Sequence, residues 1–534
     1  MPLDTARIDA IFAPWDRPDS PGVALGLVQG GELAYARGYG SANLEYGLPI
    51  TPRSIFHVAS VSKQFAAFCV VLLAQEGALS LDDEVRSLVP VVPDLGARIT
   101  VRHLLAHTSG LRDQWDLLYL AGWREADLKT DDDVLALVAR QRALNFAPGS
   151  EYVYSNTGFT LLGAIVRAVT GKSLRAFAHE RIFAPLGMQA THFHDDHREV
   201  VPGRAYAYVQ DVPAGPYRIE IPNFDTVGAT SLFTTVEDLA LWAANVRQPR
   251  VGAPVLEAMA APAALADGTP LAYGFGLAVP PYRGLRTVGH DGADGGYRAK
   301  FIVYPDADLA VIVLANLGSI RPDALARQVV DVVLEDRLGP PPVTVPATPP
   351  GDDPVAAYAG TYGLAERGEF VRLEARDGAL WAQTAGSETG EALRHIGPGR
   401  FSDPTGMLVC RFEPAPDGEP GPCLVVESPY GRARTLRPVA AWTPDEADAA
   451  RLAGTYASDE LDVRWRVEAV GTDLWLHRWK FAPERLRPLA RDAFAGPEHV
   501  TILFDRDPDG QAGGLRACTG RAWRIAFGRV RDPG

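Results

Sequence analysis

The chain has 534 residues, of which 47% are hydrophobic and 22% charged, and its formal net charge is −14. This length exceeds what one hydrophobic core fills, so we expect two to four domains. The negative charge argues against nucleic acid as a partner, because phosphates would be repelled. Apolar runs are too short to span a membrane, and the acidic start MPLDTARIDAIFAPWD is unlike a signal peptide, which favours a cytoplasmic location. The four cysteines are expected to be reduced core thiols, with a Cys410–Cys423 pair as the alternative (Cys69, Cys410, Cys423 and Cys518).

The first 338 residues mix strand-like and helix-like segments. Residues 23–40 predict two strands around a Gly-Gly turn, and residues 62–77 predict a buried helix that ends at glycine. Further strands are expected at 273–279, around 290 and within 301–316, followed by a helix at 323–339. We expect the early and late strands to share one antiparallel sheet flanked by helices, an α/β (α+β) catalytic domain over 1–338.

Proline marks the end of this region. Residues 339–354 hold seven prolines in sixteen positions, which predicts an extended linker. Beyond it, short apolar runs separated by Gly, Pro and Asp are typical of β-barrels. AGTY recurs at 359–362 and 453–456, and each copy precedes a similar series of short strands. We therefore predict two related small antiparallel β-barrel domains, over 355–442 and 443–534.

The first chemical motif is Ser60-Val61-Ser62-Lys63. On a helix starting near Ser60, residues 60 and 63 lie one turn apart on the same face. A serine hydroxyl needs a base to become a nucleophile, and lysine can accept a proton whereas arginine cannot. Only five of the 52 basic residues are lysines, so a lysine here is hard to explain as general positive charge. The structural alternative is a capping serine beside a solvated lysine.

Two further motifs follow in the chain. Tyr154-Ser155-Asn156 precedes an apolar helix, where a tyrosine beside an ammonium can act as a base and an asparagine can orient an amide. His290-Asp291-Gly292 is expected on a strand, with His290 as a donor and Gly292 admitting substrate close to the backbone. A packed tyrosine, an asparagine cap and a plain turn are the alternatives.

The ordered set Ser60-x-x-Lys63, Tyr154-x-Asn156 and His290-x-Gly292 resembles the penicillin-recognising serine hydrolases: class C β-lactamases, D,D-carboxypeptidases and related esterases. The segments HLLAHTSGL (103–111), FAPGSEYVYSN (146–156) and IFAPLGM (182–188) resemble the same family. Within it, SGLRD (109–113) with Trp115 and SDELD (458–462) are most similar to D-stereospecific aminopeptidases, which carry two C-terminal barrels.

The resemblance implies a role for each motif residue. Ser60 would form an acyl-enzyme, while Lys63 and Tyr154 would take the serine proton and pass it to the leaving amine. Asn156 would orient the substrate amide, and the backbone N–H groups of Ser60 and Ala293 would form the oxyanion hole. His290 stands where many relatives have lysine, which fits the aminopeptidase and esterase branches.

No metal or other cofactor is implied, although two histidine clusters have spacings that metal sites also use. His103 and His107 have a zinc-compatible spacing, but the glutamate of an HExxH motif is absent. The denser cluster is better explained as a solvated loop after a helix (His192, His194, Asp195, Asp196 and His197).

We therefore expect a serine hydrolase acting on small molecules or short peptides, most simply an aminopeptidase or amidase releasing N-terminal D-amino acids. Carboxylesterase, β-lactamase and D,D-carboxypeptidase activities are alternatives, as is a β-lactam-binding protein that acylates without turnover. A homodimer is left open.

One C-terminal segment is a candidate gating loop. His477–Arg487, HRWKFAPERLR, is unusually aromatic and basic for a hairpin connection, and the strand after it is expected near Pro488. By resemblance, Trp479 and Phe481 would pack at the cleft mouth and Glu484 would meet a substrate ammonium. An exposed basic loop is the alternative for the segment, and barrel core is the alternative for Trp475, Trp479 and Phe481.

Overall fold

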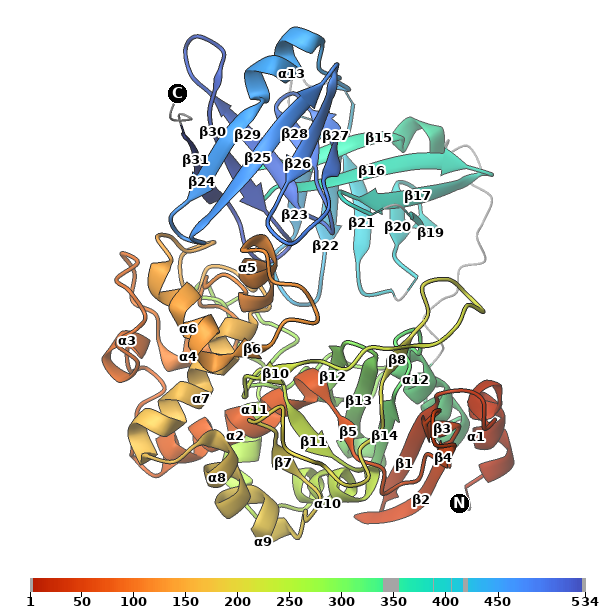
Figure 1. Ribbon diagram of the computed structural model, residues 1–534. Helices are drawn as coiled ribbons and strands as arrows, with labels where there is room; N and C mark the ends of the chain where they lie inside the picture. The colour runs from red at the N-terminus through yellow and green to blue at the C-terminus, as the bar shows by residue number, and fades with distance from the viewer. Residues whose placement is uncertain (1–2, 340–354, 388, 405, 416–420, 531–534) are drawn as a thin grey trace. The chain divides into compact units, whose positions relative to one another are not determined.

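The computed structural model describes residues 3–339, 355–387, 389–404, 406–415 and 421–530 (Figure 1). The chain forms two compact units. The first comprises Met1–Ser109, Glu125–Ala136 and Asn156–Pro341, and the second comprises Gly110–Arg124, Leu137–Ser155 and Pro342–Gly534. The predicted domain boundaries at 338, 354 and 442 stay a prediction, and residues 340–354 of the predicted linker lie outside the described residues.

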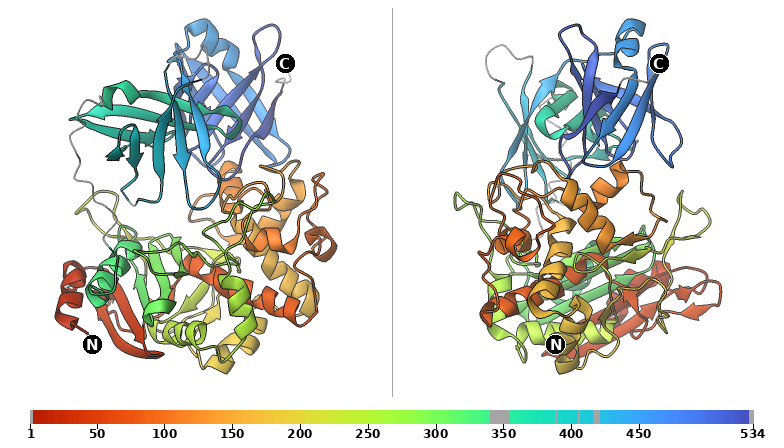
Figure 2. Two further views of the ribbon diagram at one scale, coloured as in Figure 1. Left: turned by 180° about the vertical axis from the view of Figure 1, so that it is seen from behind. Right: turned by 60° about the vertical axis from the view of Figure 1, so that its left-hand side comes forward.

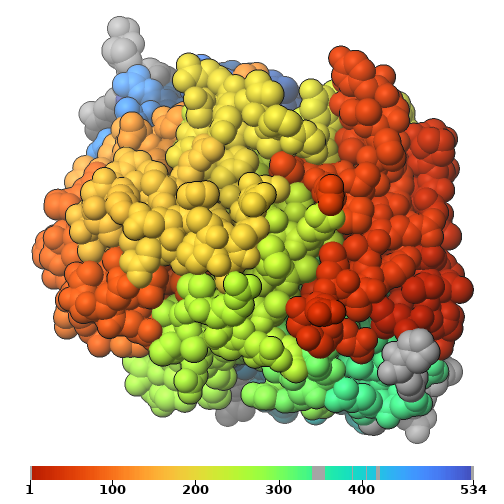
Figure 3. Space-filling model, turned by 90° about the horizontal axis from the view of Figure 1, so that it is seen from below, coloured from red at the N-terminus to blue at the C-terminus, as the bar shows by residue number. Residues whose placement is uncertain are grey.

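The first unit is built on the expected antiparallel sheet, with strand order β12-β13-β14-β1-β2. Its strands are β1 (Val23–Gln29), β2 (Glu32–Tyr39), β12 (Val288–Asp294), β13 (Tyr297–Tyr304) and β14 (Leu309–Ala315). The early strand β1 pairs with the late strand β14, from Val23 opposite Ala315 to Gln29 opposite Leu309. Strands almost 300 residues apart in the sequence are thereby joined. On the surface, too, the red N-terminal part lies beside green segments from later in the first unit (Figure 3).

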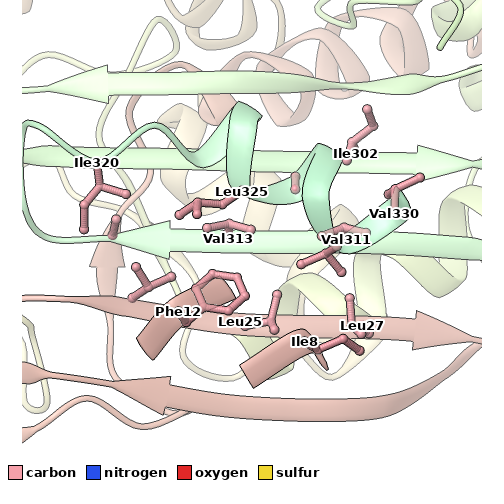
Figure 4. Packing of buried hydrophobic residues seen from close by; sticks show 14 of the residues in the cluster. Ile8, Phe12, Leu25, Leu27, Ile302, Val311, Val313, Ile320, Leu325 and Val330 are labelled. Carbon is pink, nitrogen blue, oxygen red and sulfur yellow. The ribbon is translucent and has the colours of Figure 1, made fainter. Parts of the chain in front are cut away.

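Helices cover both faces of this sheet. On one face, α1 (Thr5–Phe12) and α12 (Pro322–Val333) enclose a core that includes Phe12, Val311 and Leu325 (Figure 4). On the other face, α10 (Val236–Arg247) packs so closely that a Cβ at Gly26 would lie 2.4 Å from Val236 Cγ1. The further helices of this unit are α2 (Lys63–Gln75), α3 (Val85–Leu88), α4 (Val101–Leu105), α7 (Asn156–Thr170), α8 (Leu174–Ala178), α9 (Ala184–Leu186) and α11 (Ala253–Ala260). Helix α6 (Asp131–Arg140) has residues in both units, and α5 (Gln114–Leu120) and α13 (Glu446–Leu452) belong to the second.

Two expectations about this unit are corrected. Residues 273–279 form no strand; they make only single bridges, such as Tyr273 to Ala278, because the chain turns at Gly276 with φ +68°. The last helix begins at Pro322 but ends at Val333, six residues before the predicted end.

The second unit contains two β-sheets, visible from three directions in Figures 1 and 2. One has nine strands in the order β18-β17-β16-β15-β23-β22-β21-β20-β19, and the other is a closed eight-stranded barrel of β24 to β31. The first sheet comprises β15 (Gly360–Leu364), β16 (Glu369–Arg376), β17 (Ala379–Thr384), β18 (Glu391–Ala392), β19 (Arg394–Gly397), β20 (Arg400–Ser402), β21 (Val409–Glu413), β22 (Cys423–Glu427) and β23 (Arg434–Val439). The barrel comprises β24 (Gly454–Ser458), β25 (Val463–Val470), β26 (Asp473–His477), β27 (Glu484–Ala490), β28 (Ala493–Ala495), β29 (Thr501–Arg506), β30 (Ala512–Cys518) and β31 (Ile525–Val530).

The repeated AGTY has the same structural role in both sheets. Each copy opens the first strand, and that strand pairs with the next strand and with the last one. Both tyrosines are buried, and each hydroxyl donates to the carbonyl four residues earlier: Tyr362 to Tyr358 at 3.1 Å and Tyr456 to Leu452 at 2.7 Å. The shared geometry explains why these residues recur and confirms two related barrel-like sheets.

The cysteines in the described part of the chain are free thiols. Cys410 lies opposite Val426, and Cys423 lies opposite Glu413, so the alternative pair does not face each other across its strands. Among the described residues, no helix has the length and apolar character needed to cross a membrane.

Candidate active site

The predicted nucleophile Ser60 lies in a tight turn at the start of a buried helix. Residues Ala59–Ser62 form a 3-10 turn, and α2 continues from Lys63. Ala59 adopts φ +47°, a left-handed conformation that is costly for a residue with a side chain and is typical of sharp functional turns. The turn leaves Ser60 half-buried at the amino end of the helix.

Lys63 is fully buried and its ammonium is fixed by three oxygens. Its Nζ donates to Ser60 Oγ at 3.0 Å, to Asn156 Oδ1 at 2.7 Å and to the Ala229 carbonyl at 2.7 Å. The contact between residues 60 and 63 is the one expected from their spacing. The solvated-lysine alternative is wrong, because Lys63 has no exposed surface.

Asn156 is the first residue of α7 and is 4% exposed. Because its Oδ1 accepts from Lys63, its amide is oriented by the lysine rather than serving only as a helix cap. The Ala229 carbonyl was not predicted. A backbone acceptor leaves no signal in residue type, so sequence reasoning had no means of finding it.

His290 lies on β12 in a chain of buried hydrogen bonds. Its Nδ1 is 2.6 Å from the Asp291 carbonyl oxygen and its Nε2 is 3.0 Å from the Tyr273 hydroxyl, which is also 3.2 Å from His107 Nε2. Burial, and then the charge of Lys63, lower the pKa of His290 to about 4. The ring is therefore neutral at pH 7, with a hydrogen on Nδ1 and with Nε2 accepting from Tyr273.

Gly292 is required by the packing of the protein's own backbone. A Cβ at this position would lie 2.2 Å from the Val58 carbonyl oxygen, so β12 contacts the backbone just before Ser60. The expected role of Gly292 in admitting substrate stays a prediction. The next residue, Ala293, is exposed, and its predicted oxyanion-hole role stays a prediction.

Tyr154 lies two residues before Asn156 but clusters with the second unit. The segment that leads to it is bound to the eight-stranded barrel. Asn145 Nδ2 donates to the Arg521 carbonyl at 2.9 Å, and Asn145 Oδ1 accepts from the Trp523 backbone N–H at 2.8 Å. Glu151 forms an ion pair with Arg367. The role of Tyr154 at Ser60 stays a prediction.

The candidate gating loop is shorter than expected. Strand β27 begins at Glu484, four residues before the predicted start, so the connection is limited to residues 478–483. Glu484 accepts from the buried Arg478 at 3.0 Å. Phe481 packs on Tyr119 with ring centroids 5.5 Å apart, whereas Trp479 is 65% exposed and is not barrel core.

The two histidine clusters differ in geometry. His103 caps α4 by accepting from the Thr100 backbone N–H, and His107 contacts Tyr273, so these two serve separate structural contacts. The cluster at 192–197 is less solvated than expected, because His192–Phe193 form strand β7 and His194 is 4% exposed.

Ligand atoms of His192, His194 and Glu199 lie within 4.8 Å of one another. However, both Glu199 oxygens accept from Arg175, at 2.6 and 2.8 Å, and the guanidinium places positive charge where a cation would bind.

Known proteins resemble this chain over most of its length. Residues 8–335 match the Beta-lactamase family. The chain belongs to this family of hydrolases. It is 29% identical over 460 residues to a D-aminopeptidase of Gluconobacter oxydans, covering 86% of this chain and 83% of the relative. It is 28% identical to a D-aminopeptidase of Cereibacter sphaeroides, covering 99% of this chain and 100% of the relative.

A solved structure shares the fold. The octameric penicillin-binding protein homologue from Pyrococcus abyssi superposes with a TM-score of 0.58 at 23% identity, covering 82% of this chain and all of that one. The family, its β-lactamase-like fold and the barrel-like C-terminal sheets are thus as expected from the sequence.

Proposed function

We propose that this protein is a serine hydrolase that forms an acyl-enzyme on Ser60 and releases N-terminal D-amino acids from small peptides, amides or esters. The observation that carries the proposal is the 3.0 Å hydrogen bond between Ser60 Oγ and the Nζ of a fully buried lysine. Hydrogen bonds to Asn156 and Ala229 hold the Lys63 Nζ next to the serine hydroxyl, the group whose proton must be removed.

In the proposed mechanism, Ser60 Oγ attacks the substrate carbonyl as its proton moves to Lys63 or Tyr154. The carbonyl oxygen becomes an oxyanion bound by the backbone N–H groups of Ser60 and Ala293. When the tetrahedral intermediate collapses, the carbon–nitrogen bond breaks and the amine leaves with a proton returned from the same pair. Water then repeats these steps to release the acid and free Ser60.

We assign His290 no proton-transfer step in this mechanism, because its Nδ1 lies on the Asp291 carbonyl oxygen and its Nε2 on the Tyr273 hydroxyl. A neutral ring whose Nε2 accepts from Tyr273 does not supply a positive charge at pH 7. The neutral ring supports binding of an uncharged amide or ester near β12. It does not support binding of a substrate carboxylate by a positively charged His290.

The substrate class rests on relatives named D-aminopeptidase at 28 and 29% identity. The alternatives are carboxylesterase, β-lactamase and D,D-carboxypeptidase activity, or β-lactam binding without turnover. The octameric penicillin-binding protein homologue from Pyrococcus abyssi supports testing for self-association beyond a homodimer.

A substrate panel tests the proposal. Wild type and Ser60→Ala are assayed with D- and L-aminoacyl p-nitroanilides, p-nitrophenyl esters and nitrocefin, and the residue labelled by a fluorophosphonate is mapped by mass spectrometry. We expect preference for D-aminoacyl substrates, loss of all hydrolysis in Ser60→Ala, and label on Ser60. Label on Ser62, or an active Ser60→Ala protein, would contradict the assignment of the nucleophile.

A further inference from the structure

A buried polar cluster that the proposed mechanism does not use lies beside the nucleophile turn. His57 Nε2 is 3.0 Å from Thr230 Oγ1 and 3.0 Å from Asp294 Oδ2, and the Thr230 hydroxyl donates to the same carboxylate oxygen. His57 is 3% exposed and Thr230 2% exposed, so these two members are shielded from water, whereas Asp294 is partly buried. Hydrogen bonds in such surroundings are strong, and losing one partner leaves a buried polar group unpaired.

The hydrogens of this cluster follow from its chemistry. An ionised carboxylate only accepts, and the single hydroxyl hydrogen of Thr230 is directed to Asp294. The hydrogen on His57 Nε2 must then lie toward the Asp294 and Thr230 oxygens. Ring contacts fix the same imidazole, because it stacks on Tyr297 at 5.5 Å and meets Phe233 edge-on at 5.4 Å.

Each member of the cluster belongs to a different segment of the candidate site. His57 is three residues before Ser60, in β5 (Phe56–His57). Thr230 follows Ala229, whose carbonyl accepts from Lys63. Asp294 ends β12 and follows Ala293, the predicted oxyanion-hole residue.

Backbone contacts join the same three segments. The Val58 N–H donates to the Leu232 carbonyl at 3.0 Å, and the Leu232 N–H donates to Ser62 Oγ at 2.9 Å. Gly292 lies against the Val58 carbonyl. The His57 cluster is therefore one further side-chain link, besides Ser62 and Lys63, among segments that also touch through their backbones.

We propose that His57, Thr230 and Asp294 are positioning residues that hold the Ala229 carbonyl and the 292–293 backbone in register with Ser60 and Lys63. The inference rests on the proposed function, since it assigns the cluster to the same acyl-transfer step. A shift of about 1 Å between a nucleophile and its proton acceptor or oxyanion donors is enough to cost about 10²-fold in rate.

The chain offers a matched control for His57. Strand β11 (Leu232–Thr234) is flanked by β5 and by β7 (His192–Phe193), and Phe233 pairs with His57 on one side and with His192 on the other. His192 also stacks on Phe233, at 5.8 Å. His192→Phe thus alters the same sheet on the side away from Thr230 and Asp294.

The experiment compares His57→Phe, His57→Gln and His192→Phe by kcat, KM, fluorophosphonate labelling rate at Ser60 and thermal midpoint. We expect His57→Phe to lower kcat and the labelling rate by about 10²-fold with little change in KM. His57→Gln, whose amide N–H can replace Nε2–H, should recover most of this loss, and His192→Phe should stay within about twofold of wild type. If His57→Phe does not fold, Thr230→Val, which keeps the volume and removes both hydrogen bonds of Thr230, serves in its place.

Several results would overturn the inference while leaving the proposed function intact. They are a folded His57→Phe or Thr230→Val variant with unchanged kcat, a His57→Gln variant no better than His57→Phe, or an equal loss in His192→Phe. An active Ser60→Ala variant would instead overturn the proposed function and the inference together.

Discussion

The nucleophile segment and the tyrosine segment both lie inside the region that matches the family, but different parts of the molecule hold them. Residues 57–63 are bound by the sheet and loops of the first unit, through Val58, Ser62 and the cluster at His57. Residues 137–155 cluster with the second unit, where Asn145 contacts the loop between β30 and β31.

The boundaries of the family match therefore differ from the boundaries of the structural units. The match over 8–335 is continuous in sequence, yet two stretches within it, Gly110–Arg124 and Leu137–Ser155, belong to the compact unit of the C-terminal sheets. We infer that contacts within the first unit hold the serine–lysine pair, and that contacts with the barrel hold the segment that leads to Tyr154.

The largest effect is expected at Lys63. Lys63→Arg should lower kcat/KM by at least ~10³-fold, equivalent to about 4 kcal/mol, because arginine keeps the charge but cannot accept a proton. Its larger planar head also cannot reproduce the contacts to Ser60, Asn156 and Ala229 in a fully buried site. Steady-state kinetics on the best D-aminoacyl substrate measures this. If Lys63→Arg keeps more than about a tenth of wild-type activity, Lys63 acts only through its positive charge and does not accept the serine proton.

On the other side of the comparison, the pair Arg112–Glu460 links segment 110–124 to the barrel. The two side chains are 2% and 7% exposed, and Arg112 also donates to Gln141 Oε1 at 3.1 Å. Arg112→Met should destabilise the second unit by about 3 kcal/mol, because it leaves a buried carboxylate without its cation. The shift of the urea transition, followed by tryptophan fluorescence, measures this.

The control for Arg112 is an exposed ion pair in the same barrel. Arg485 and Asp473 are 57% and 38% exposed, so Arg485→Met should cost less than about 0.5 kcal/mol. The double variant Arg112→Met/Glu460→Leu should recover part of the loss, since it removes both buried charges. Equal destabilisation by Arg112→Met and Arg485→Met would show that the buried pair does not hold this segment.

The sequence predicted those features that are local or that repeat. The Ser60–Lys63 contact follows from helical spacing, and the AGTY repeat led to two sheets that share a buried tyrosine contact. The sharing of one antiparallel sheet by early and late strands was also expected, but the sequence did not give the strand order or the register.

Features made by distant backbone or by weak patterns were not predictable. The Ala229 carbonyl is a peptide group 166 residues from Lys63, and the His57–Asp294 contact spans 237 residues. The start of β27 was misjudged because Leu486 is the one buried residue among charged neighbours in 484–487. The dependence of segment 137–155 on the barrel arises from polar contacts such as Asn145 with Trp523, which leave no periodic pattern.

A smaller effect is expected at Arg521, which lies on the barrel loop that contacts Asn145. Although burial opposes it, attraction to Asp113, Asp116 and Tyr154 raises the pKa of Arg521. A nearby guanidinium favours the ionised form of a phenol. Removing it in Arg521→Met should therefore make deprotonation of Tyr154 harder. We expect the ascending limb of kcat/KM against pH to move to higher pH by about one unit.

Two variants sharpen this measurement. Arg521→Lys keeps the charge and should leave the limb near its wild-type position. Arg516→Met removes a cation that pairs with Asp505 elsewhere in the barrel and should leave it unchanged. If the limb moves equally in Arg521→Met and Arg516→Met, the cause is the general loss of positive charge. If it stays in place in Arg521→Met, Arg521 does not affect the ionisation of Tyr154.

The smallest effect concerns substrate range and the loop between β26 and β27. Arg478 is nearly fully buried and donates to the Tyr119 hydroxyl at 2.9 Å, so the base of the loop is fixed on segment 110–124. Trp479, by contrast, is 65% exposed. An exposed tryptophan on a fixed base is an arrangement suited to contacting a ligand, and by resemblance we expect it to narrow substrate entry.

Replacing residues 479–482 with a short Gly-containing turn, while keeping Arg478 and Glu484, should preserve the ion pair at 3.0 Å and hence the fold. We expect a few-fold rise in activity on bulky esters relative to small D-aminoacyl amides, since excluding a large acyl group by one aromatic contact is worth about 1 kcal/mol. The same replacement at the exposed 507–510 turn between β29 and β30 is the control. An unchanged ratio of bulky to small substrates in a folded 479–482 variant would show that this loop does not select substrates.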